Sequence, residues 1–219
     1  VEKDPRCYEH IDPKQIGNER VLVVSNQSGK SNIINKLKKL KINVQNKEKK
    51  VIKFLEKIKE QEFLGYAYDG AEASFELLAK RAFQRFKEFY NLENFKVSDE
   101  KRKNIKNEFV PFSEARVKIF VGKKSFYSAA EGNGPIHALD MALRNALIKF
   151  YPRIKKLNLV DYKVRILTPQ DGTKALVRVR IESKNDQLKW STIGVSHNVI
   201  DASYIALNDS ITYHLLKSK

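Results

Sequence analysis

Three consecutive residues, Gly29, Lys30 and Ser31, could form the second half of a phosphate-binding loop. Such a loop has the pattern G-x-x-x-x-G-K-[ST], because two glycines let the backbone curl and direct successive N–H groups at phosphate oxygens. The first glycine should stand five residues before Gly29, and Val24 occupies that position. A β-branched residue resists the dihedral angles that this loop requires. We therefore interpret the segment as a strand at Val21–Val24, a turn and the start of a helix, with no bound nucleotide.

Residues that bind metals or act as nucleophiles are dispersed along the chain. The histidines His10, His137, His197 and His214 lie far apart, and Cys7 is the single cysteine. A zinc site needs several such ligands at short, defined spacings. The G-x-S-x-G pattern of hydrolases and the glycine pattern of dinucleotide-binding folds are also missing from the sequence. The residues alone therefore predict no metal site, and they favour a binding or regulatory module over a self-sufficient active site.

The segment EGNGP, Glu131 to Pro135, is better suited to a small ligand. Its glycines allow close approach of a ligand to the backbone, and it opens a predicted helix with Pro135 in the first turn. A helix start carries unpaired N–H groups that suit a carboxylate. The sequence therefore predicts a site for a small anionic or zwitterionic ligand here, although ordinary packing between a strand and a helix would explain the pattern equally well.

An apolar pattern in this helix occurs a second time near the end of the chain. Ile136, Ala138, Ala142, Leu143 and Leu147 recur 64 residues later as Ile200, Ala202, Ala206, Leu207 and Ile211. Each set follows a short loop that contains an asparagine. We therefore expect two strand-plus-helix units related by a pseudo-two-fold axis, with both helix starts facing one crevice.

The remaining elements follow from hydrophobic periodicity. Helices are predicted at 31–40, 46–61, 132–151 and 198–216, and the segment 65–90 is expected to open with Gly and Asp turn signals and to continue as a long helix. Strands are predicted at 114–122, 124–130, 160–168, 174–182 and 189–196. The charged stretch 98–108, which is followed by Pro111, is the best candidate for a domain boundary. The expected fold class is α+β, with a mostly helical subdomain at 1–111 and a domain with antiparallel sheets at 112–219.

The composition excludes several classes of protein. A chain of 219 residues with 42% hydrophobic residues can bury a core, so it is not disordered. No apolar run approaches the roughly 20 residues of a membrane span, and the N-terminus lacks a signal-peptide pattern. A single cysteine fits a reducing compartment. We expect a cytoplasmic chain without a membrane partner, whose first residues look like the cut edge of a longer protein.

The formal net charge of +16 raises the question of a nucleic-acid partner. Lysine carries most of the excess, whereas arginine is the better reader of bases and phosphates. The densest basic block, Lys38 to Glu60, mixes Lys with Glu and places Val51, Phe54 and Ile58 at helical spacing. We interpret it as an amphipathic helix with a solvated basic face. No nucleic-acid partner is therefore expected, and a basic RNA-binding module is kept as the distant alternative.

Several longer segments resemble one known family. The segments CYEHIDPKQIGNERVLVVSNQSGKSNI and GYAYDGAEASFELL are similar to the linker region of the 2-isopropylmalate synthase/homocitrate synthase family, on its citramalate synthase branch. The segments YSAAEGNGPIHALDMALRNAL, LVDYKVRIL, DGTKALVRVRIES and STIGVSHNVIDASYIALNDSI resemble its C-terminal regulatory domain. The likeness covers nearly the whole chain. It implies that 1–111 is a linker subdomain and that 112–219 is an allosteric and dimerisation domain.

The resemblance also implies site residues. Tyr8 matches a linker tyrosine that contributes to the catalytic barrel of the partner subunit. The effector pocket of the family corresponds to the following positions of this sequence: Gly132, Asn133, Gly134, Pro135, Ile136, Tyr162, Ile166, Thr173 and Ile200. Ordinary core packing is the alternative for Ile166 and Ile200, and aromatic packing is the alternative for Tyr8.

The activity that the resemblance implies belongs to a larger protein. In the family, a barrel that holds a divalent metal condenses acetyl-CoA with a 2-oxoacid, and this chain contains none of that barrel. No cofactor is therefore expected in the chain itself. The expected partners are a second copy of the chain and a branched-chain amino acid. That effector would be isoleucine for a citramalate synthase, and leucine for a 2-isopropylmalate synthase.

Overall fold

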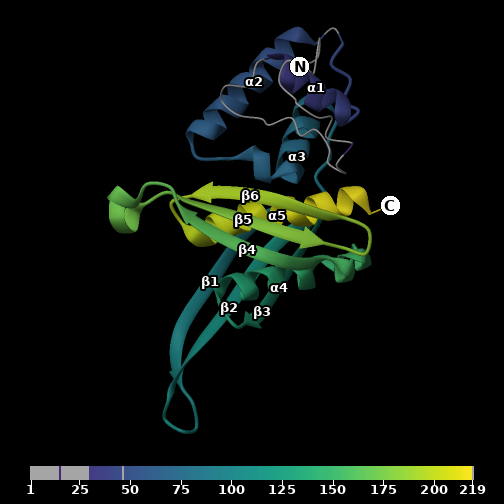
Figure 1. The fold of residues 1–219 in the computed structure, drawn as a ribbon. Coiled ribbons are helices and arrows are strands. Elements are labelled where there is room, and N and C mark those ends of the chain that lie inside the picture. The colour runs from purple at the N-terminus through teal and green to yellow at the C-terminus, as the bar shows by residue number, and fades with distance from the viewer. Residues whose placement is uncertain (1–14, 16–29, 46, 219) are drawn as a thin grey trace.

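The computed structural model describes residue 15 and residues 30–45 and 47–218. Three expectations lie outside these residues: the strand at Val21–Val24, the turn at Gly29 and the linker tyrosine Tyr8. Figure 1 shows helices on one side of the molecule, two sheets with their covering helices in the middle, and a long hairpin that extends away on the other side.

The N-terminal part is helical, as predicted. Its elements are α1 (Lys30–Lys39), α2 (Glu48–Phe63), the 3-10 helix η3 (Tyr68–Gly70) and α3 (Glu72–Phe83). The buried residues of α2 are Val51, Phe54 and Ile58, whose spacing puts them on one helix face. Phe54 meets Phe75 of α3 edge to face, with ring centroids 5.9 Å apart. The three helices therefore share a core of their own.

The long helix predicted within 65–90 extends too far. The observed helix α3 ends at Phe83, and Gln84 has an extended backbone with φ −116° and ψ 163°. Phe83 still packs in the helical core, whereas Phe89 packs edge to face on Tyr151 of the second core. The chain therefore leaves the helix because its next aromatic residues belong to a different core.

Two antiparallel three-stranded sheets follow, each completed by a helix. The first unit consists of β1 (Asn91–Lys103), β2 (Phe109–Val121), β3 (Lys124–Gly132) and α4 (Pro135–Leu147). The second consists of β4 (Asn158–Ile166), β5 (Val177–Lys184), β6 (Lys189–Ser196) and α5 (Val199–Lys217), preceded by the 3-10 helix η4 (Pro152–Lys156) and interrupted by η5 (Pro169–Lys174). In both sheets the strand order follows the chain. Ile136 and Ile200 are the second residues of α4 and α5, so the predicted repeat is a real structural repeat and the α+β class is confirmed.

Strand β1 was missed by the sequence prediction. It pairs with β2 from Asn91–Phe120 to Lys103–Phe109, with one register shift between Leu92 and Asn94. Its outer part is the first half of the charged stretch 98–108, and residues 104–108 connect the two strands. Pro111 lies within β2 opposite Lys101, so the sheet continues across the position that separates 1–111 from 112–219. That division stays a prediction.

One core joins the two units. It contains Val117 of β2, Leu143 of α4, Ile181 of β5 and Ala206 of α5. Helix α4 covers β2 and β3, helix α5 covers β5 and β6, and α3 packs on both β6 and α5. In the described part of the chain, no helix has both the length and the apolar character that a membrane crossing needs.

Candidate functional site

The loop between β3 and α4 carries five of the predicted site residues. Gly132 ends β3, and a Cβ atom at this position would lie 2.3 Å from the backbone nitrogen of Ala138. Gly134 precedes the helix with an extended backbone, and a Cβ there would meet no atom within 4 Å. Gly132 therefore serves close packing of strand and helix, whereas Gly134 leaves open space beside the helix start.

His137 fixes part of this loop. The backbone N–H of Asn133 donates to His137 Nδ1 over 3.1 Å. A nitrogen that accepts this bond carries no proton, so the neutral ring is protonated on Nε2. The loop conformation at the start of α4 is thus held by a side chain of the first helical turn.

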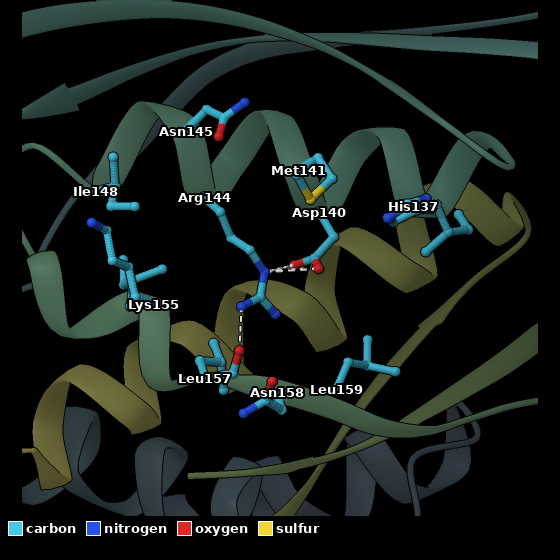
Figure 2. Close-up of a pocket in the computed structure, with 12 residues that line it drawn as sticks. His137, Asp140, Met141, Arg144, Asn145, Ile148, Lys155, Leu157, Asn158 and Leu159 are labelled. Carbon is cyan, nitrogen blue, oxygen red and sulfur yellow. Dashed lines mark hydrogen bonds and ion pairs between the residues drawn. The ribbon is translucent and has the colours of Figure 1, made fainter.

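A cavity of about 600 Å³ runs along the outer face of α4. Figure 2 shows its lining side chains, which come from α4 on one side and from η4 and the first residues of β4 on the other. Apolar groups are contributed by Ile136, Met141, Ile148 and Leu159. A groove with mostly apolar walls and a few polar groups is the usual form of a small-molecule site.

An ion pair supplies the polar part of this wall. Arg144 Nε donates to both carboxylate oxygens of Asp140, over 2.9 and 2.8 Å, and Arg144 Nη1 donates to the carbonyl of Leu157. Both side chains are mostly buried, so the pair is poorly screened by water. A guanidinium has five N–H groups, and these contacts use two of them. The pair can therefore present donors to a carboxylate and an acceptor to an ammonium group.

Two further predicted residues are associated with the start of α5, Ile200 as its second residue and Tyr162 through a hydrogen bond to its first turns. Tyr162 on β4 is hydrogen-bonded to Ser203 over 2.7 Å, and Ser203 lies three residues after Ile200 on α5. Asn198 caps this helix by accepting the N–H groups of Ile200 and Asp201 over 2.8 and 3.3 Å. The first N–H groups of α5 are thus occupied by the chain itself, and the open helix start is that of α4.

Two side chains tie the later turns of α4 and α5 to the region of η4. His214, near the end of α5, is hydrogen-bonded through Nε2 to the carbonyl of Arg153 in η4 over 2.9 Å. Arg144 ties the second half of α4 to Leu157, just after η4. The expected crevice between the two helix starts stays a prediction, because the cavity is lined by residues of α4 and by none of α5.

Of the nine predicted effector residues, Ile136 alone lines the cavity. Ile166 is 56% exposed at the end of β4, and Thr173 is exposed in η5. Ile166 lies seven residues beyond Leu159 on one strand, a span of about 20 Å at roughly 3.3 Å per residue. Within one chain, the cavity is therefore lined by Ile136 but not by Ile166 or Thr173.

The sequence prediction missed Asp140, Arg144, Met141 and Leu159. The available signal was the spacing of Asp140 and Arg144, four residues apart on a predicted helix. Such pairs are common on solvated helix faces, so the spacing alone does not indicate a site. Among the described residues, no three His, Cys, Asp or Glu side chains gather as a metal site.

Comparisons with known proteins cover the entire chain. A family model described as the LeuA allosteric (dimerisation) domain matches residues 69–215, and one described as homocitrate synthase post-HMGL domain-like matches residues 1–62. The chain is 48% identical over 219 residues to an (R)-citramalate synthase of Geobacter sulfurreducens and 47% identical over 219 residues to one of Aquifex aeolicus. An (R)-citramalate synthase of Synechocystis sp. is 41% identical over 215 residues.

The alignments are unequal in coverage. They include 100%, 100% and 98% of this chain but only 41%, 41% and 39% of the three relatives. The chain thus spans about two-fifths of the length of these relatives. The two family models meet between residues 62 and 69, where α2 ends and η3 begins.

Proposed function

The chain belongs to the LeuA allosteric (dimerisation) domain family, and from this premise we propose that it is the feedback region of a citramalate synthase-like acyltransferase. The complete enzyme would condense acetyl-CoA with pyruvate in isoleucine biosynthesis, and its metal-binding catalytic part would lie outside this chain. Relatives named (R)-citramalate synthase at 48% and 47% identity support this proposal. In the same proposal Tyr8, outside the described residues, contributes to the catalytic part of the partner subunit.

The effector in this proposal is a branched-chain amino acid. The main observation that supports this choice is the cavity along α4. A free amino acid has a carboxylate, an ammonium group and a side chain, each of which needs a matching contact. Arg144 offers N–H groups to the carboxylate and Asp140 offers an oxygen to the ammonium group. Ile136, Met141 and Leu159 offer an apolar wall to a branched side chain.

The effector residues expected from the sequence fit this proposal to different degrees. Ile136 lines the cavity, and Gly134 leaves space for a ligand at the start of α4. Tyr162 and Ile200 support the adjacent start of α5. Ile166 and Thr173 are exposed and would reach a ligand only from a second copy of the chain.

A homodimer through the C-terminal half is part of the proposal. Large apolar side chains are exposed on three elements of this half, at Met141 of α4, Val160 and Val164 of β4 and Val199 of α5. Exposed apolar surface of this kind is typical of a protein–protein contact. The family description names dimerisation as well as allostery.

The route from effector to linker would run through α5. Arg81 of α3 donates to Asp209 of α5 over 3.0 Å, and the buried Glu76 of α3 accepts from Lys217 over 2.8 Å. Burial raises the pKa of the Asp209 carboxyl, and the Arg81 charge opposes this effect. A shift at the start of α5 would therefore be transmitted to α3 through these contacts. The coupling free energy between two allosteric sites is typically about 1–3 kcal/mol.

Thermal unfolding with isoleucine, leucine, valine or no addition tests the proposal. A ligand that binds only the folded state stabilises it by about 2.7 kcal/mol at a hundredfold excess over Kd. We expect the largest upward shift of Tm with isoleucine, and we expect Arg144→Gln to abolish it. A larger shift with leucine would assign the chain to the 2-isopropylmalate synthases instead. No shift with any of the three would contradict an amino-acid effector.

A further inference from the structure

The hairpin formed by β1 and β2 is longer than the sheet that supports it. Strand β3 ends at Gly132, which pairs with Ser113 of β2. Residues Asp99–Phe112, here called the arm, continue beyond this point as a ribbon of two strands that stands away from the body (Figure 1). An isolated two-stranded hairpin is marginally stable in water. Packing on another surface would therefore stabilise the arm.

The exposed apolar side chains of the described residues are unevenly distributed. Three lie on the arm, at Ile105, Phe109 and Val110. Three others lie on β4, at Val160, Val164 and Ile166. Ile105 is fully exposed in the hairpin turn and Phe109 is 66% exposed. The chain thus carries an apolar tip and, separately, an apolar strand.

The apolar strand is an open edge of its sheet. Strand β4 pairs with β5 on one side only, in the order β4-β5-β6. After the register shift at 159–161, the side chains of Tyr162, Val164 and Ile166 alternate onto one face. Tyr162 contacts Ser203 of α5, so this face is the one that α5 covers. Val164 and Ile166 therefore extend a core face that lies open at the edge of the sheet.

The charge of the arm favours a second copy over an acidic partner. The whole chain has a formal net charge of +16, whereas the arm has four basic and three acidic side chains. Arg102 is paired with Glu100 and lies over the ring of Phe112 at 3.7 Å. A nearly neutral tip can approach another copy of this basic chain with little repulsion, and it offers little attraction to nucleic acid.

We propose that the arm docks on the β4 face of a second copy of this chain. In a two-fold dimer each arm crosses to its partner, so the contact is made twice. The arm of one copy would then cover Val164 and Ile166 of the other. This inference rests on the homodimer of the proposed function and names the contact that forms it.

Sedimentation velocity over a range of concentrations tests this contact. Ile105→Ser alters only a fully exposed turn residue, and a shortened chain replaces Lys101–Pro111 by Asn-Gly, a pair that favours two-residue hairpins. Val164→Ser alters the docking face. We expect each of the three to weaken dimerisation at least tenfold. The matched control is Leu188→Ser, an exposed apolar residue in the turn of the β5–β6 hairpin, and we expect it to dimerise as the wild type does.

Two results would overturn the inference in distinguishable ways. If the wild type is dimeric and the arm variants dimerise equally well, the arm is not the contact between the copies. The effector proposal is then unaffected, because it is tested separately by the isoleucine-induced shift of Tm. If the wild type is monomeric at every concentration, the proposed dimer fails together with the arm. Circular dichroism of each variant verifies that the body is folded. In a Cys7→Ser background, Ile105→Cys mixed with Val164→Cys and treated with an added thiol oxidant should form a disulfide between two copies.

Discussion

Ser203 Oγ on α5 lies 2.7 Å from the phenol oxygen of Tyr162 on β4 and donates its own hydrogen to the carbonyl of Val199 over 2.6 Å. Since the serine proton is used in the second bond, Tyr162 is the donor in the first. The edge strand beside the cavity is thereby attached to the first turn of α5. The later turns of the same helix hold α3 through Asp209 and Lys217. One helix thus connects the proposed effector site with α3.

Replacing Tyr162 by Phe removes this donor and keeps the ring. We expect the free energy of unfolding to fall by about 1 kcal/mol, since a typical internal hydrogen bond contributes that much. We also expect a smaller isoleucine-induced shift of Tm, because the start of α5 is less well held. Tyr127→Phe is the control, since Tyr127 is 60% exposed on β3. Equal unfolding curves for the two variants would show that the bond contributes nothing.

Two neighbouring glycines should respond in opposite ways to substitution. Gly132→Ala places a methyl group 2.3 Å from the backbone of Ala138, and such overpacking costs about 1–3 kcal/mol of stability. A Cβ added at Gly134 meets no atom within 4 Å, and the extended backbone there suits a β-branched residue, so we expect Gly134→Val to cost less than about 1 kcal/mol. If Gly134 borders the ligand, its variant should fold normally and lose the isoleucine shift. An unchanged shift would place the ligand elsewhere.

Sequence periodicity predicted α4 and α5 because each buries one apolar stripe in a single core, and the 64-residue repeat located both helices. It failed on β1, whose outer half is exposed on both faces and is specified by pairing with β2 rather than by its own pattern. It also failed at Phe83, because local spacing does not reveal that Phe89 packs in a different core.

The candidate site was predictable only in part for a similar reason. The loop at Gly132–Ile136 has a local signature, namely glycines before a helix with proline at its start. The cavity exists because η4 and β4 fold back along α4, which brings Leu157 and Leu159 beside Arg144. Nothing in the spacing of these residues indicates that contact, so the sequence does not reveal the ion pair as part of a site.

Gly65 lies where the helical part contacts the second sheet, so its substitution tests that contact. Its φ of +101° is unfavourable for other residues, and an added Cβ would lie 2.3 Å from Leu167 Cδ1 at the end of β4. Gly122, with φ of +61° and no atom within 4 Å, is the matched control for backbone strain alone. Strain of this kind costs about 1–3 kcal/mol in either variant. We therefore expect Gly65→Ala to lower the free energy of unfolding more than Gly122→Ala does, and the difference is the cost of the Leu167 contact. Chemical denaturation of both variants measures the difference. Addition of Leu167→Ala should reduce the loss of stability in the Gly65 variant only. Equal losses of stability in the two glycine variants, with no recovery on adding Leu167→Ala, would contradict a clash with Leu167.

His214 should make the stability of the fold depend on pH. The residue is 1% exposed, with its ring stacked on Trp190 and its Nε2 bonded to the carbonyl of Arg153. Burial lowers the pKa of His214 below its ordinary value of about 6.5, the hydrogen bond to the Arg153 carbonyl partly opposes this, and the charges of Arg153 and Arg144 lower the pKa further. The unfolded chain then binds the proton more tightly than the folded one. The free energy of unfolding should therefore be highest above pH 6.5 and should decrease as the pH falls through 6.5 towards the lower folded value.

Denaturation between pH 8 and pH 5 measures this dependence. His214→Gln should lower the stability at pH 8, because the stacked ring is lost, and should flatten the decline towards pH 5. His137→Gln is the control, since His137 is exposed at the start of α4 and the decline should persist in that variant. A His214→Gln curve that stays parallel to the wild type would show that the decline arises from other groups. The buried imidazole at the end of α5 would then be a packing residue without influence on the acid stability of the domain.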